Sequence, residues 1–154
     1  MIAKEELNIL WSLEQTAEKY ADRVAVSDVD QELTWKELVK NAQVIGAELS
    51  EKVQPGNPVP VLLEKSTETL AVMLGIVYAG CFYVPVNPMN PAERLRKIME
   101  KLEPEVIISD EKGKEQLAAV GNGLENKVMG PEALTTATGT ELSEEQYSRL
   151  EQIQ

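Results

Sequence analysis

Two short apolar runs joined by a helical stretch constrain this chain most. The runs are Val59–Leu63 and Phe82–Val86, and their length and content are typical of buried strands. Ser66 can cap the helix between them, and Gly80 suits the left-handed residue that ends it. The apolar residues at helical spacing are Leu70, Met73, Leu74, Val77 and Tyr78. A strand, a helix and a second strand form a βαβ unit, in which the two strands are parallel.

The rest of the chain continues this alternation of helices and strands. Thr34 is expected to cap a helix with Glu37 in a capping box, and Asn90 with Pro91 to begin another, with Glu93 reaching back. The other expected elements are a helix over 7–20, hairpin strands 23–27 and 32–34, a strand over 106–108, a helix over 112–120, and a strand over 127–129. The pattern predicts an α/β layered domain with a mainly parallel sheet flanked by helices.

After Gly130 the character of the sequence changes. Thr135–Thr140 has the composition of a loop, and Ser143 can cap a helix whose apolar anchors are Tyr147 and Leu150.

Charge and composition exclude several classes of function. The net charge of −11 would repel a phosphate backbone, so nucleic acid is not an expected partner. Charged residues interrupt every long apolar stretch, so no membrane span or membrane partner is expected, and the acidic first residues do not form a signal peptide. The single cysteine, Cys81, fits a reducing, cytoplasmic setting. The absence of histidine excludes a Ser-His-Asp triad and any histidine metal site.

Glycines and a cysteine offer candidate chemistry, but each is better explained structurally. Gly75 and Gly80 have the spacing that opens a phosphate-binding P-loop, but Cys81-Phe82 stands where Lys-Ser or Lys-Thr is needed. Gly121-Asn-Gly123 lacks the third glycine of a dinucleotide turn. Cys81 has no neighbouring cation or base to form a thiolate, so a buried inert thiol is expected.

Charged residues at the ends of elements offer a second set of candidates. Asp28, Asp30, Asp110 and Glu111 lie at or after strand ends, where α/β sheets bind ligands but where acidic turns are also common. With Lys112 they allow a receiver-like phosphoacceptor as a minor hypothesis. Arg94 follows a helix start, where a structural ion pair or a solvated position is favoured over an anion site.

Two segments carry a family resemblance. Leu33–Leu38 (Leu-Thr-Trp-Lys-Glu-Leu) resembles the first core motif of adenylate-forming enzymes, and Val77–Pro88 with Asn90–Arg94 resembles their second. The stretch from about residue 10 to 110 is similar to the N-terminal part of amino-acid adenylation domains, such as those of nonribosomal peptide synthetases, and also resembles D-alanine–carrier-protein ligases. The sequence departs from the family in having Cys81 where glycine or alanine is usual, and Asn87 where aspartate is usual.

The resemblance implies an enzyme that activates a carboxylate with ATP and Mg²⁺ and transfers the acyl group to a thiol. In this family a Thr/Ser/Gly-rich phosphate loop normally follows a segment like Glu141–Gln154, and neither that loop nor the later catalytic residues are present here. No catalytic, cofactor-binding or metal residue is therefore assigned, and ATP and Mg²⁺ are expected only in the intact enzyme. The predicted organisation is an α/β N-terminal subdomain over 1–130, then a loop and partial helix over 131–154 leading to a missing remainder.

The expected function is that of a truncated, inactive N-terminal fragment of an amino-acid-activating ligase. Its expected partners are the remainder of the enzyme and, in the intact enzyme, the amino acid and a carrier protein. Loss of the remainder would expose an apolar face or a sheet edge, so self-association is also expected. The alternative is a stand-alone α/β binding or interaction module that complements separately encoded parts.

Overall fold

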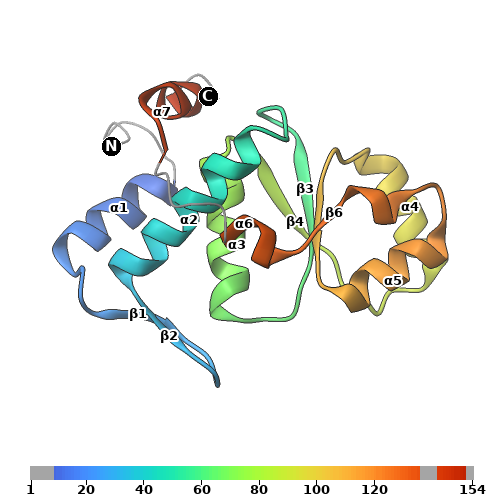
Figure 1. Cartoon of the computed structure of the whole chain (residues 1–154), viewed down its shortest axis with the longest axis horizontal. Helices are drawn as coiled ribbons and strands as arrows, with labels where there is room; N and C mark the ends of the chain where they lie inside the picture. The colour runs from blue at the N-terminus through green and yellow to red at the C-terminus, as the bar shows by residue number, and fades with distance from the viewer. Residues whose placement is uncertain (1–8, 136–141, 152–154) are drawn as a thin grey trace.

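The computed structural model describes residues 9–135 and 142–151 (Figure 1). In chain order the elements are α1 (Ile9–Lys19), β1 (Val24–Ser27), β2 (Glu32–Thr34), α2 (Trp35–Ser50), β3 (Pro58–Leu62), α3 (Thr67–Tyr78), β4 (Phe82–Pro85), α4 (Ala92–Leu102), β5 (Ile107–Ser109), α5 (Glu111–Val120), the 3-10 helix η1 (Leu124–Lys127), β6 (Val128–Met129), α6 (Pro131–Thr135) and α7 (Glu144–Glu151). No helix in the two described ranges is long and apolar enough to cross a membrane.

A parallel sheet of four strands forms the centre of the fold, in the order β4-β3-β5-β6. Val59 on β3 lies opposite Tyr83 on β4, and Val61 lies opposite Ile108 on β5. In Figure 1 the sheet lies between a layer that contains α2 and α3 and a layer that contains α4 and α5. The predicted parallel α/β architecture, including the βαβ unit, is confirmed, and β3 is buried because helices cover both of its faces.

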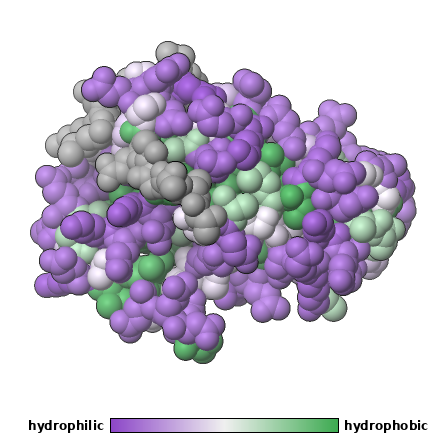
Figure 2. Space-filling view, in the orientation of Figure 1, coloured by the Kyte–Doolittle hydropathy of each residue, from purple (hydrophilic) through white to green (hydrophobic). Residues whose placement is uncertain are grey.

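The predicted β1–β2 hairpin is also present and is antiparallel. At its turn, Asp28 Oδ1 accepts hydrogen bonds from the backbone N–H groups of Asp30 and Gln31, at 2.9 and 3.0 Å. Asp28 Oδ2 accepts another from the N–H of Thr67, at 2.8 Å, so the turn is tied to the first turn of α3. Most of the face in Figure 2 is hydrophilic, and an apolar group marks the hairpin tip, where Val29 is 99% exposed.

The helix α3 is more completely buried than an amphipathic stripe requires. Leu74 and Tyr78 are buried as predicted, but so are Val72 and Ile76, which lie on other sides of the helix. The reason is that α3 packs against α2 as well as against the sheet. The two helices approach closely at Gly46 and Gly75, where a Cβ atom on Gly46 would lie 2.5 Å from the Tyr78 Cβ atom.

Most of the predicted caps are confirmed. Thr34 and Glu37 form the complete capping box, Ser66 accepts from the N–H of Thr69, and Ser143 accepts from the N–H of Gln146 at 3.2 Å. The predicted capping box at the start of α4 is wrong. Pro91 is the cap residue there, no side chain caps the helix, and Glu93 instead forms an ion pair with Arg96.

The region after Gly130 contains a short helix, α6, that the composition did not predict. Thr135 ends α6, and the remainder of the predicted loop lies outside the described residues. Leu134, Leu142 and Leu150 all join the main hydrophobic core with α1, α2 and α3.

Candidate functional site

The first motif segment, Leu33–Leu38, builds the junction between β2 and α2. The Thr34 hydroxyl accepts from the N–H of Glu37 at 3.2 Å, and the Glu37 carboxylate accepts from the N–H of Thr34 at 2.8 Å. The Thr34 N–H lowers the pKa of Glu37 most, and the Thr34 hydroxyl, which donates to the same carboxylate oxygen at 3.0 Å, lowers it further. Thr34 and Glu37 therefore begin a helix and satisfy its first backbone donors, which is a structural role.

The second motif segment builds the passage from α3 through β4 to α4. Gly80 has φ of 75°, as predicted for the residue that ends α3, and its carbonyl accepts from the N–H of Gly56 at 2.8 Å. Arg94 is exposed on the first turn of α4. Other residues of α4 form its ion pairs. Arg96 contacts Glu93 and Glu100, and Lys97 Nζ lies 3.7 Å from Glu93.

The candidate glycine loops are helix-packing and turn positions. Gly75 lies inside α3, where a Cβ atom would lie 2.7 Å from the Ile45 Cβ atom and 3.0 Å from the Ala42 carbonyl oxygen. Gly121 and Gly123, with φ of 87° and 69°, form the turn between α5 and η1. Neither set forms a loop of backbone N–H groups directed at an anion.

Cys81 is a buried thiol between α3 and β4, as the sequence predicted. Its side chain is 7% exposed, and Sγ lies 3.4 Å from the carbonyl oxygen of Gln54. Burial raises the pKa of the Cys81 thiol, which disfavours the thiolate that a nucleophile requires.

The candidate carboxylates do not converge on a site. Three backbone N–H groups, with that of Thr67 contributing most, lower the pKa of Asp28 to about 2. Asp110 caps α5 by accepting from the N–H of Gly113 at 2.8 Å, while Glu111 and Lys112 are exposed. Within residues 9–135 and 142–151, no group of three or more acidic, cysteine or histidine side chains could hold a metal ion. The described residues therefore provide no metal site of the kind that a phosphoacceptor domain requires.

A partly buried polar cluster joins four helices, and sequence periodicity did not predict it. The Tyr78 hydroxyl donates to Glu14 Oε1 at 2.9 Å, and Gln43 Nε2 donates to the Tyr147 hydroxyl at 2.7 Å. The Tyr147 hydroxyl lies 3.3 Å from the same Glu14 oxygen. Burial, followed by the charge of Glu14, raises the pKa of Tyr78 far above its ordinary value. The cluster attaches α7 to α1, α2 and α3.

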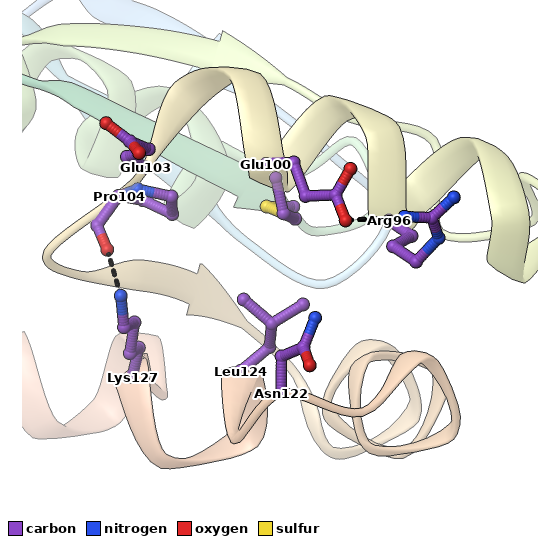
Figure 3. Close-up of a pocket in the computed structure, with 8 residues that line it drawn as sticks. Arg96, Glu100, Glu103, Pro104, Asn122, Leu124 and Lys127 are labelled. Carbon is purple, nitrogen blue, oxygen red and sulfur yellow. Dashed lines mark hydrogen bonds and ion pairs between the residues drawn. The ribbon is translucent and has the colours of Figure 1, made fainter.

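A cavity of about 470 Å³ lies between the end of α4 and η1 (Figure 3). Met99 and Leu124 contribute apolar walls, and Lys127 Nζ donates to the Pro104 carbonyl at 2.9 Å. The cation at the other end, Arg96, is paired with Glu100. The remaining lining residues are Glu103 and Asn122. Arg96, Glu100 and Lys127 are engaged in this ion pair and this hydrogen bond, and the lining includes none of the residues of the two motifs.

The fold and the two motif junctions define the N-terminal part of an adenylation domain. The chain matches the family described as AMP-binding enzyme over residues 13–152, and it belongs to this family. It is 37% identical over 107 residues to bacitracin synthase 1 of Bacillus licheniformis, a match that covers 69% of this chain and 2% of that protein. It is 41% identical over 88 residues to gramicidin S synthase 2 of Brevibacillus brevis, covering 56% of this chain and 2% of that protein.

Solved structures confirm the fold. The N-terminal subdomain of Klebsiella oxytoca NpsA, in complex with 3-hydroxybenzoyl-AMSN, matches with a TM-score of 0.75 and 21% identity, over 88% of this chain and 33% of that chain. The nonribosomal peptide synthetase FmoA3 in its AMPPNP-bound form matches with a TM-score of 0.71 and 26% identity, over 85% of this chain and 14% of that chain. The predicted resemblance to N-terminal subdomains of adenylate-forming enzymes is thus confirmed.

Proposed function

We propose that this chain is the N-terminal scaffold of an enzyme that activates an amino acid with ATP and Mg²⁺ and passes it to a carrier protein. The observation that carries the proposal is the pair of motif segments, each located at the helix–strand junction it forms in the fold. The nonribosomal peptide synthetase FmoA3 has also been solved with alpha-methyl-L-serine-AMP bound, which supports an amino acid as the substrate of the whole enzyme. The relatives matched by sequence are bacitracin synthase 1 and gramicidin S synthase 2. The chain spans only about 2% of those proteins, so their activity is attributed to it here as a proposal.

The described residues do not fit a site for ATP and Mg²⁺. The Asp28 carboxylate accepts hydrogen bonds from three backbone N–H groups, and no acidic cluster suits a metal ion within the described ranges. Cys81 and Phe82 replace the lysine and hydroxyl residues that hold phosphates in a P-loop. We therefore expect the 154-residue polypeptide alone to form no acyl-adenylate, because residues 9–135 and 142–151 form no site that would stabilise the charge on the phosphates.

An ATP–pyrophosphate exchange assay tests both parts of the proposal. The purified 154-residue chain, tested with each standard amino acid and with D-alanine, should give the exchange rate of buffer. A chimera should support exchange if it joins this chain to the remaining part of the matched adenylation domain of gramicidin S synthase 2. A rate above buffer for the chain alone would contradict its inactivity. A chimera that is folded but inactive would contradict the scaffold role.

A stand-alone interaction module is the second candidate, and the exposed aromatic residues Phe82 and Tyr83 favour it. The codons after Gln154 discriminate the two functions. A phosphate-loop sequence in the same reading frame would support the scaffold, whereas a stop codon would support the module.

We also propose a cytoplasmic location, in which the buried Cys81 stays reduced. Cell fractionation tests this location.

A further inference from the structure

The edge strand β4 is exposed in a way that the rest of the sheet is not. It pairs with β3 on one side, and no other strand of the described residues pairs with its outer edge. Phe82 and Tyr83 are 50% and 39% exposed. Since successive side chains of a strand point to opposite faces, both faces of β4 are incompletely covered at this end. Parallel sheets normally have both faces covered. The exposed aromatic side chains and the unpaired edge of β4 are therefore typical of a surface that contacts another chain.

The charge pattern supports that interpretation. The chain carries 26 acidic and 15 basic residues, but none lies between Glu68 and Glu93. This uncharged segment includes the whole of β4 and the following loop, where Met89 is 69% exposed. Two copies that each carry a net charge of −11 would repel one another across most of their surfaces. This segment itself adds no like charge to a contact between two copies.

The other strand edges are less suitable. The strand β6 has two residues, lies between Lys127 and Glu132, and is followed directly by α6. The hairpin strands β1 and β2 are flanked or occupied by charged residues, including Arg23 and Glu32. Charged side chains on edge strands oppose pairing with another chain.

The backbone of β4 leaves few hydrogen-bonding groups free for pairing with a second copy. The N–H groups of Phe82 and Val86 donate to the carbonyls of Asn57 and Val61. The backbone N–H and C=O groups of the even-numbered residues of β4 therefore point toward β3. Because these groups alternate along a strand, the backbone polar groups of Tyr83 and Pro85 point away from β3, toward the open edge. Proline has no N–H group, so Tyr83 supplies the only outward donor of the strand. An antiparallel pair centred on Tyr83 would exchange two N–H···O bonds between two copies about a two-fold axis.

We propose that this chain forms a symmetric dimer through β4, with Tyr83 of one copy opposite Tyr83 of the other and Phe82 packed across the interface. The pairing adds one strand to the edge of each sheet, and the uncharged segment adds no like charge there. The proposal concerns the 154-residue chain and does not depend on its having adenylating activity.

Sedimentation velocity over a concentration series tests the dimer, with two variants and one matched control. Phe82→Lys should raise the dimer dissociation constant roughly tenfold or more, because it places a charge at each side of the interface. Tyr83→Pro removes the outward donor without removing a bond to β3, and it should have a similar effect. Val29→Lys makes the same change of charge at a hairpin residue that is 99% exposed, and it should leave dimerisation unchanged.

Hydrogen exchange locates the contact independently of the variants. The Tyr83 amide should exchange more slowly at high protein concentration than at low concentration, while the Val29 amide should not change. Circular dichroism establishes that each variant is folded. The proposal is overturned if the unmodified chain is monomeric at the highest concentration that stays in solution. It is equally overturned if a dimer forms without concentration-dependent protection of Tyr83, or if Val29→Lys weakens it as much as Phe82→Lys does.

Discussion

Replacing Gly75 with alanine tests whether the close approach of α2 and α3 limits the stability of the fold. A Cβ atom at Gly75 would lie 2.7 Å from the Ile45 Cβ atom and 3.0 Å from the Ala42 carbonyl oxygen. Both contacts are with atoms at or near the α2 backbone, so rotation of a side chain cannot relieve them. The helices must move apart, although α3 is buried on several sides.

The magnitude follows from two opposing effects. Alanine stabilises a helix interior by about 1 kcal/mol relative to glycine. Overpacking a buried contact costs about 1–3 kcal/mol, and contact with backbone atoms favours the upper part of that range. Gly75→Ala should therefore lower the free energy of unfolding by about 1–2 kcal/mol. For a chain of this size each kcal/mol lowers the melting temperature by about 2–4 °C.

Urea and thermal denaturation of the single and double variants measure the effect. Ile45→Ala alone should cost about 2–5 kcal/mol, because Ile45 is fully buried. In that background Gly75→Ala should cost less, with a coupling of about 0.5–3 kcal/mol, because Ile45→Ala removes the Ile45 Cγ2 atom, which is the atom nearest to a Cβ at Gly75, although the other two contacts remain. Additive costs, or a Gly75→Ala variant more stable than the original chain, would refute the explanation by close packing.

Three further changes test the core, a cap and a titrating group. Leu74→Ala should lower the free energy of unfolding by about 2–5 kcal/mol, because Leu74 is only 6% exposed, and a loss well below 1 kcal/mol in urea denaturation would contradict its burial. Thr34→Ala should cost about 1 kcal/mol through loss of the capping box, whereas Thr34→Ser should retain most of it. The lowered pKa of Asp28, about 2 against an ordinary 3.8, means that its carboxylate stabilises the fold above about pH 3.8 and that this contribution is lost as the pH falls toward 2. Asp28→Asn should flatten the dependence of stability on pH in that window, and an unchanged acid-denaturation profile would contradict the link to Thr67.

Much of the local structure could be predicted because it depends on neighbouring residues. The capping box of Thr34 and Glu37 lies within four residues, and the left-handed conformation of Gly80 follows from its position after a helix. The start of α4 shows the limit of the same reasoning. Glu93 had a better partner in Arg96, three residues further on, than in the backbone it was expected to cap.

The partly buried polar cluster could not be predicted in this way. Tyr78 fits the apolar pattern of α3 equally well as a purely hydrophobic residue, and Tyr147 was expected only as an apolar anchor. Their hydroxyl groups meet at Glu14, 64 and 133 residues away from it in the chain. Such a contact depends on how α1, α3 and α7 pack, and no local pattern specifies that packing.

The sequence by itself determined most of the helices and strands, most of their caps, the parallel βαβ unit and the family, because these depend on periodicity and short-range hydrogen bonding; α6 and η1 were not predicted. Only the tertiary structure decided the strand order β4-β3-β5-β6, the glycine contact between α2 and α3, and the exposure of Phe82 and Tyr83 on β4. These features depend on which helix and strand surfaces pack against one another in the folded chain. That packing involves residues far apart in sequence, so no local pattern specifies it.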